Sequence, residues 1–440
     1  MIQQIAFIIV LGAAGYFIRK RFLFIWANIK LGKSKEIKDR GADRMRNMLL
    51  VAFGQKKMFK RFIPAFLHFF IYIGFLIINL EVLEFIIDGM AGTHRIFAPY
   101  LGALYPFLMN LFEFLAVAVL VACAIMLIRR NVIRVRRFWS AEMTAWPRLD
   151  ANLILITEIV LMTAILTMNA TDQVLQTKMP EHYAATGKLF FSANLIPLFQ
   201  HLDVVPLVII ERVAWWFHIL GILGFAIYIT YSKHLHIFLA FPNTYFANLE
   251  PKGQIINMPV VTNEVKSMLG LTDAAATTGP PAEPGRFGAK DVNDLTWNNL
   301  LAAYSCTECG RCTSECPANL TGKKLSPRKI MMDTRDRMEE VGKSLSTGGA
   351  GLGDGKTLLN DYITKEEINA CTSCNACVEA CPVMINPLEI ILELKRYVAM
   401  EESGSPASWN SMFQNIETNF APWKFSPADR FNWVNELKNK

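Results

Sequence analysis

The sequence predicts an all-α fold in two parts, a bundle of about five transmembrane helices followed by a mostly helical soluble domain. The 440-residue chain has a mean hydropathy of +0.26 and 52% hydrophobic residues, yet its long apolar runs all lie before about Phe246. Eight of its nine cysteines fall in two short groups in the polar remainder. A chain of this length and uneven composition is expected to form at least two domains.

Five stretches are long and apolar enough to cross a bilayer as helices. They are residues 2–18, 62–87, 101–128, 151–168 and 213–241. The first stretch resembles a signal peptide in length. However, it lacks a basic segment before the apolar run, and Arg19, Lys20 and Arg21 follow it, so we expect an uncleaved anchor.

The basic residues predict the orientation, because lysine and arginine are retained on the cytoplasmic side. Residues 19–61 and 129–137 are rich in them, whereas 88–100 and 171–212 carry few. We therefore expect a multi-pass protein of a bacterial inner membrane, with its N-terminus outside and the soluble domain in the cytoplasm. The net charge of +7 is explained by these loops, so nucleic-acid binding is not expected.

The composition suggests four regions. Residues 1–246 form the transmembrane domain, 247–290 a linker, 291–402 the soluble domain and 403–440 a C-terminal tail. Within the linker, residues 271–287 are rich in Ala, Thr, Pro and Gly, as surface connections are.

The two cysteine groups have the spacing C-x-x-C-x-x-C-x-x-x-C-P, which is typical of proteins with two [4Fe–4S] clusters. In such motifs the fourth cysteine reaches the other cluster. The predicted ligands of one cluster are Cys306, Cys309, Cys312 and Cys381, and those of the other are Cys371, Cys374, Cys377 and Cys316. We therefore expect the soluble domain to be ferredoxin-like and to lie in a reducing compartment.

Structural zinc is the alternative for these cysteines, since it also takes four thiolates from paired C-x-x-C units. Zinc does not explain the duplicated third and fourth cysteines or the prolines that follow them. Cys123, alone in the third span, is expected to be a packing residue.

The sequence around the cysteines, residues 304–318, 321–335 and 370–383, resembles the iron–sulfur region of heterodisulfide-reductase-related membrane oxidoreductases. This resemblance covers roughly residue 287 to the C-terminus. It implies a quinone-linked enzyme system, and members of that family accept electrons from electron-transfer flavoprotein.

Three histidines in or near the apolar stretches are candidate cofactor ligands, because intramembrane histidines are usually functional. His68 lies near the inner end of the second stretch, and His218 and His236 lie 18 residues apart on the fifth. On one continuous helix those two would be separated by about 27 Å, near opposite membrane surfaces.

Residues 216–245 resemble the haem-bearing last helix of the gamma subunit (cytochrome b) of membrane nitrate reductases, with His218 and His236 at its ligand positions. The resemblance implies an inner haem b held by His68 and His236, with His234 as the competing ligand. The second outer-haem ligand of that family is replaced by Ile78. An outer haem on His218 would need another partner, and the candidates are His201 and His94.

Two glutamates lie within the apolar stretches, Glu113 and Glu158. Each suggests either a proton or quinone site, or a protonated side chain that is hydrogen-bonded between helices.

The C-terminal tail is a candidate docking segment. In the resembled family a similar stretch precedes a cysteine-rich domain with C-C-G motifs, but no cysteine follows Cys381. We therefore expect that domain to be a separate subunit, bound through Pro422, Trp423, Arg430 and Trp433, unless these residues pack on their own domain.

The predicted function is electron transfer without substrate chemistry of its own, between a cytoplasmic dehydrogenase partner and membrane quinone through two [4Fe–4S] clusters and haem b. One alternative is the relay subunit of a thiol/disulfide oxidoreductase. Another is a redox sensor, which usually carries an output module.

Overall fold

The computed structural model describes residues 1–271, 286–424 and 426–439. Their regular secondary structure is helical, with two isolated bridges and no β-strand, which confirms the predicted all-α class. Most of the predicted linker stretch 271–287 lies outside the described residues, and the division into four regions stays a prediction.

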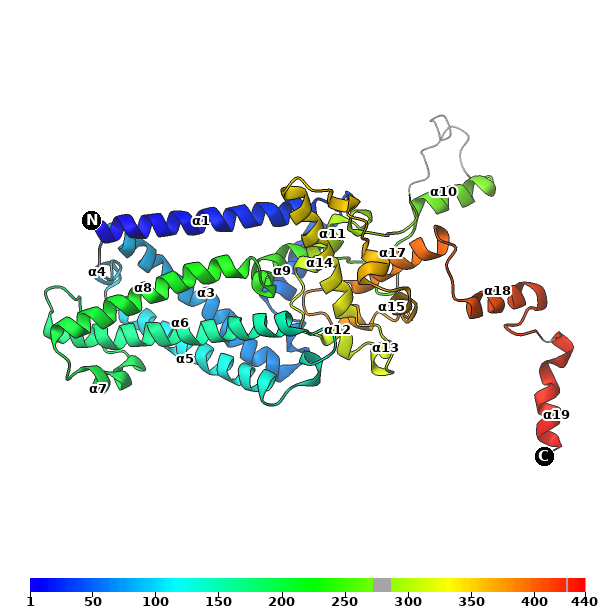
Figure 1. Ribbon diagram of the computed structural model, residues 1–440. Helices are drawn as coiled ribbons and strands as arrows, with labels where there is room; N and C mark the ends of the chain where they lie inside the picture. Colours follow the sequence, from blue (N-terminus) through cyan, green and yellow to red (C-terminus); the bar gives the residue numbers. More distant parts are fainter. Residues whose placement is uncertain (272–285, 425, 440) are drawn as a thin grey trace.

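Five long helices lie side by side in one bundle (Figure 1). They are α1 (Ile2–Ile29), α3 (Phe62–Ala91), α5 (Leu104–Asn131), α6 (Ala145–Lys178) and α8 (Val204–Ile229). All five are long and apolar enough to span a membrane, which confirms the predicted number. Because α6 and α8 are longer than their apolar runs, the loop between them is only residues 179–203, shorter than the predicted 171–212.

The fifth apolar stretch is not one helix, so the prediction of a continuous span over 213–241 is wrong. α8 ends at Ile229, and η5 (Lys233–Leu235) and α9 (His236–Tyr245) follow after a turn. Ser232 causes the break, because its hydroxyl accepts the backbone N–H of His234 at 3.1 Å and donates to Asp150 at 2.6 Å. The 18-residue spacing of His218 and His236 therefore does not measure a rise along one helix.

Short helices connect the spans at both ends of the bundle. On the side of the soluble domain they are α2 (Gly41–Met48), η1 (Leu49–Phe53), η2 (Met58–Lys60) and η3 (Arg136–Phe138). At the opposite end they are α4 (Ala98–Leu101), η4 (Ser192–Leu195) and α7 (Ile196–Phe199). Another helix, α10 (Pro259–Met268), lies between α9 and the soluble domain.

The soluble domain is built around two amphipathic helices, α14 (Pro327–Ser346) and α17 (Pro387–Met400). Each begins with proline at its first position after a capping residue, Ser326 or Asn386, whose side chain accepts a backbone N–H. The shorter elements around them are η7 (Val292–Asp294), α11 (Trp297–Tyr304), α12 (Arg311–Ser314), α13 (Pro317–Leu320), η8 (Gly351–Gly353), η9 (Leu358–Tyr362), α15 (Lys365–Asn369) and α16 (Ala376–Ala380).

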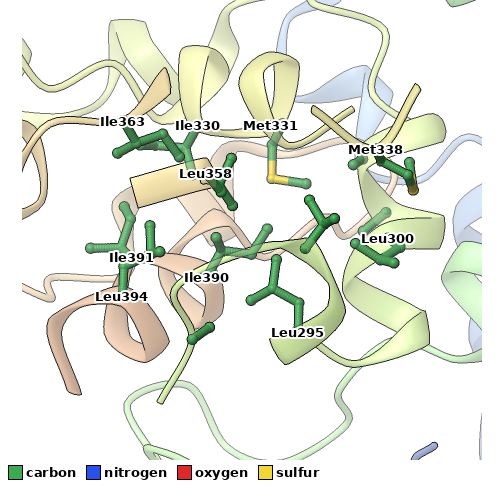
Figure 2. Close-up of a cluster of buried hydrophobic side chains, with 14 of the residues drawn as sticks. Leu295, Leu300, Ile330, Met331, Met338, Leu358, Ile363, Ile390, Ile391 and Leu394 are labelled. Atoms are coloured by element: carbon green, nitrogen blue, oxygen red, sulfur yellow. The ribbon is translucent and has the colours of Figure 1, made fainter. Parts of the chain in front are cut away.

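The apolar faces of α14 and α17 meet in the core of this domain (Figure 2). The side chains labelled there are all at most 1% exposed, and they are Leu295, Leu300, Ile330, Met331, Met338, Leu358, Ile363, Ile390, Ile391 and Leu394. Burial to this degree on several helices at once makes the domain one packed unit.

The first transmembrane helix also belongs to this core, so the bundle and the soluble domain are packed together. Ile25 and Ile29 of α1 are buried in the soluble core, and the Asn28 amide donates to the Tyr304 hydroxyl at 2.8 Å. The N-terminus lies at the opposite end of the bundle from the soluble domain (Figure 1).

A buried polar network closes the end of the bundle that is far from the soluble domain. Its centre is Arg95, which is 3% exposed and donates to Glu81 at 3.3 Å, Asn169 at 2.7 Å and Asp172 at 3.3 Å. Asn169 in turn donates to Glu113 at 3.2 Å. Burial of so many polar groups is stable only because they pair with one another.

The C-terminal tail extends away from the rest of the chain (Figure 1). It consists of α18 (Ala407–Asn419), η10 (Pro427–Phe431) and α19 (Asn432–Lys438). Trp423 and Trp433 are 54% and 60% exposed, so they do not pack on their own domain.

Candidate functional site

The eight cysteines of the soluble domain have neighbours from both sequence motifs. Cys312 lies near Cys306, Cys309 and Cys381, and also near Cys377 of the second motif. Cys377 in turn lies near Cys371, Cys374 and Cys316. These neighbours are compatible with two clusters that each take three cysteines of one motif and the fourth of the other, and this division stays a prediction.

The two motifs fold in the same local way. The second and fourth residues after the first cysteine have left-handed backbones in both, namely Glu308 and Gly310 in one loop and Ser373 and Asn375 in the other. Gly310 and Asn375 then precede the short helices α12 and α16. The two cysteine loops therefore share one backbone conformation.

The surroundings of the thiols determine how they could bind a metal. In the part of the chain that the structure describes, no three His, Cys, Asp or Glu side chains converge on a site for a single metal ion. Burial raises the pKa of Cys306 and of Cys377 to about 12, so bound iron must displace their protons. Backbone N–H groups of Ser373 and Ile385 lie 3.4 and 3.3 Å from the sulfur atoms of Cys371 and Cys381, as around iron–sulfur clusters.

A cavity of about 300 Å³ lies where the bundle meets the first cysteine group. His68 of α3, His234 of η5 and His236 of α9 line it, together with Cys309. The predicted inner histidines and the first cluster loop therefore line one shared cavity.

His68 and His236 both line this cavity, with ring centres 6.4 Å apart and ring planes tilted by 40°. Bonds between a metal and an imidazole nitrogen are about 2 Å long, so two imidazoles on opposite sides of one metal have centres roughly 6 Å apart. The Nδ1 atom of His236 lies 3.1 Å from the carbonyl oxygen of Lys233, which leaves its Nε2 free. The Nδ1 atom of His68 is buried with no hydrogen-bond partner among the described residues.

The other candidate histidines are placed differently. His234 lies beside His236, with ring centres 5.3 Å apart at 84°. His218 is 2% exposed, and its Nδ1 lies 3.0 Å from the carbonyl oxygen of Leu161, while its ring packs against Phe85. The structure brings no second histidine opposite it among the described residues.

The candidates for a partner to His218 lie elsewhere. The Nε2 atom of His94 is 3.2 Å from Asp172 in the distant polar network, and His201 is exposed in the loop before α8. The role of His218 as a haem ligand stays a prediction.

The two intramembrane glutamates also differ in their surroundings. Glu113 accepts the backbone N–H groups of Phe191 and Ser192 at 3.1 and 3.2 Å, so it holds the loop at the far end of the bundle. Glu158 lines the cavity, and Tyr72, whose buried hydroxyl has no partner in the described part of the chain, lines it as well.

Sequence reasoning missed the charged residues that join the two parts at this cavity. Glu308, in the first cluster loop, pairs with Lys233 at 2.5 Å and with Arg335 at 2.8 Å. Burial raises the pKa of Glu308, but Arg335 and Lys233 outweigh it and hold this pKa below its usual range. The sequence did offer one indication, because Glu308 lies between Cys306 and Cys309 and must therefore be close to the group that these cysteines bind.

The comparisons with known proteins agree with the cysteine geometry. Residues 305–385 match the family model of the 4Fe-4S dicluster domain, which supports two [4Fe–4S] clusters in the soluble domain. No solved structure shows a significant match to the chain.

Three relatives are oxidoreductases or subunits of one, by their names. The chain is 28% identical to the probable iron–sulfur-binding oxidoreductase FadF of Bacillus subtilis, over 94% of this chain and 59% of the relative. It is 25% identical to the EtfAB:quinone oxidoreductase of Syntrophomonas wolfei, over 90% of this chain and 55% of the relative.

The third relative is one component of the dihydromethanophenazine:CoB–CoM heterodisulfide reductase of Methanosarcina mazei, which is 28% identical over 33% of this chain and 36% of the relative. The chain thus spans little more than half the length of the first two relatives, 59% and 55%. These findings confirm the predicted relation to iron–sulfur oxidoreductases.

Proposed function

We propose that this chain is a membrane electron-transfer subunit, in which the first cluster exchanges electrons with membrane quinone through haem b held by His68 and His236. The observation that carries the proposal is the shared cavity, which His68, His236 and Cys309 all line. Bound there, haem b would supply a one-electron carrier between the cluster and the membrane.

The arrangement of the two histidines supports bis-histidine ligation. Their ring separation of 6.4 Å matches two imidazoles on one metal, and the contact of His236 with the Lys233 carbonyl fixes the ring. We assign the cluster ligands as Cys306, Cys309, Cys312 and Cys381 for the first cluster, and Cys371, Cys374, Cys377 and Cys316 for the second.

The deep end of the cavity suits a quinone headgroup. Phe75 and Leu76 line it and are 36% and 39% exposed on the side of the bundle, where lipid tails would lie. Tyr72 and Glu158 face the same space and offer a hydroxyl and a carboxyl. We propose that these two groups hold the quinone oxygens and exchange the protons that quinone reduction requires.

The electron donor is proposed to be a cytoplasmic dehydrogenase, either electron-transfer flavoprotein or a subunit with C-C-G motifs. The name of one relative, an EtfAB:quinone oxidoreductase, supports the first of these classes. The exposed Trp423 and Trp433 of the projecting tail support docking there, since aromatic side chains are enriched at interfaces. The positive-inside pattern supports a cytoplasmic soluble domain.

Haem content in histidine variants tests the proposal. The chain purified from membranes should show a reduced haem α-band, and His68→Ala and His236→Ala should each abolish it. His234→Ala should retain it, as a matched control in the same cavity. A wild-type chain without haem, or loss of haem in His234→Ala but not in His236→Ala, would refute the assignment.

A further inference from the structure

The cavity lining has an excess of positive charge. The arginines that line the cavity are Arg129, Arg130, Arg137 and Arg311. The acidic residues that line it are Glu158 at the deep end and Glu308, which is already paired with Lys233 and Arg335. Among the described residues, no carboxylate forms an ion pair with any of the four arginines.

Arg311 is the most deeply buried of these cations, at 4% exposure. Its Nη1 donates to the Met58 carbonyl at 3.2 Å, and its Nη2 lies 3.1 Å from the Met58 sulfur. A guanidinium has five N–H donors, and these neutral contacts use only two of the five. A buried guanidinium without an anion is unfavourable, so the arrangement calls for an anionic partner.

Arg137 also lacks an anionic partner among the described residues. Its Nε is buried without a hydrogen-bond partner in the described part of the chain, and its Cζ lies 4.9 Å from the ring centre of Phe138. Burial lowers the pKa of Arg137 to about 10, and Arg61, Arg311 and Arg129 contribute to the decrease, although Cys309 opposes it.

Both arginines share the cavity with His68, His236 and Cys309. Arg311 follows Cys309 by two positions in the first cluster loop, so it lies beside the predicted cluster. An anion bound by the pair would therefore lie at the edge of the cavity nearest the cluster.

We propose that Arg137 and Arg311 form the binding site for the carboxylate side chains of the haem that His68 and His236 hold. This inference rests on the proposed function, because it assumes a haem in the cavity. The guanidinium fork matches a carboxylate in a bidentate pair. The two histidines fix the metal, and the two arginines select which edge of the porphyrin faces the cluster.

Arg137 and Arg311 should also affect the reduction potential of the haem. Reduction of the haem adds negative charge, so nearby guanidinium groups stabilise the reduced state, and their loss should lower the potential. We expect the double variant Arg137→Gln/Arg311→Gln to lose haem, or to shift the oxidation equilibrium about tenfold, which is about 59 mV for a one-electron couple.

The test uses the full chain in detergent, with haem per chain from the α-band and separate redox titrations of haem and clusters. Arg137→Gln is the cleanest single change, because the Arg137 side chain donates no hydrogen bond to a described residue. The matched control is Arg136→Gln, an exposed neighbour on the same short helix that does not line the cavity. Lysine variants should recover part of the haem affinity, since they keep the charge but lose the fork.

The outcomes separate the two proposals. A wild-type chain without haem overturns both of them. A double variant with unchanged haem content and potential overturns only the arginine assignment. A shift of the cluster potential alone would also overturn the arginine assignment. Loss of bound phospholipid phosphorus with unchanged haem would overturn it as well, and would assign the site to a lipid phosphate. Unchanged cluster content in the variants establishes that they fold.

Discussion

Replacing Glu308 by glutamine should strongly destabilise the junction between the bundle and the soluble domain. The Glu308 side chain is 3% exposed and lies 2.5 Å from Lys233 and 2.8 Å from Arg335. Glutamine has a similar size but no charge, so it leaves two partly or fully buried cations without their shared partner. Removing one partner of a buried ion pair typically lowers the free energy of unfolding by about 3–5 kcal/mol.

The structure favours the lower end of this range. In the variant, Lys233 would still have two partners, Asp150 at 3.8 Å and the Pro147 carbonyl at 2.6 Å. Arg335 would still have Asp336 at 3.2 Å. We therefore expect a loss of about 3 kcal/mol, measured by denaturant unfolding in detergent micelles and followed by helical circular dichroism.

A surface pair across the same junction provides the control. Glu315 pairs with Arg61 at 2.6 Å, but its side chain is 52% exposed. Glu315→Gln should change the free energy of unfolding by only about 0–1 kcal/mol. Equal effects of the two substitutions would refute the view that the buried pair fixes the cluster loop on the bundle.

Three further predictions concern the clusters, the far end of the bundle and the dependence of stability on pH. Cys381→Ser should perturb the electron paramagnetic resonance signal of one cluster and Cys316→Ser that of the other, and identical spectra would contradict crossed ligation. Arg95→Gln should lower the free energy of unfolding by about 3–5 kcal/mol, because it leaves buried carboxylates unpaired, and a loss below about 1 kcal/mol would contradict this. Burial alone would raise the pKa of Glu142, but the interactions with Arg328 and Ser326 are stronger and hold this pKa below its usual value of 4.5. The ion pair between Glu142 and Arg328 should therefore stabilise the fold above pH 4.5 and lose this effect as the pH falls through the lowered pKa. The difference in the free energy of unfolding between wild type and Glu142→Gln should shrink accordingly in acid.

Local patterns were enough to predict the parts of the structure that depend on neighbours in sequence. Long apolar runs predicted the five helices, and the spacing of the cysteines predicted a domain of the two-[4Fe–4S] type. Both follow from chain geometry over a few residues.

The break in the fifth apolar stretch could not be predicted in this way. Residues 213–241 are apolar enough to continue as one helix, but Ser232 and Lys233 bind Asp150 of α6, and Lys233 also binds Glu308 of the soluble domain. These partners are 75 or more positions away in the sequence, and only the folded chain brings them together.

The basic loops illustrate a second limit. The cluster around residues 129–137 was interpreted as an orientation signal, and its arginines all look equivalent in sequence. The structure distinguishes them, because Arg137 lines the cavity whereas Arg136 is exposed to the exterior. Side chains that serve a site between two domains are identified only once both domains are placed.

Reoxidation of the reduced chain by a short-chain quinone tests the central claim most directly. The purified chain is reduced with dithionite, freed of excess reductant and mixed with the quinone in a stopped-flow spectrometer. We expect the clusters to reoxidise in the wild type, and to do so much more slowly in His236→Ala with its clusters intact. Equal rates in the two proteins, or reoxidation by a disulfide but not by quinone, would contradict it.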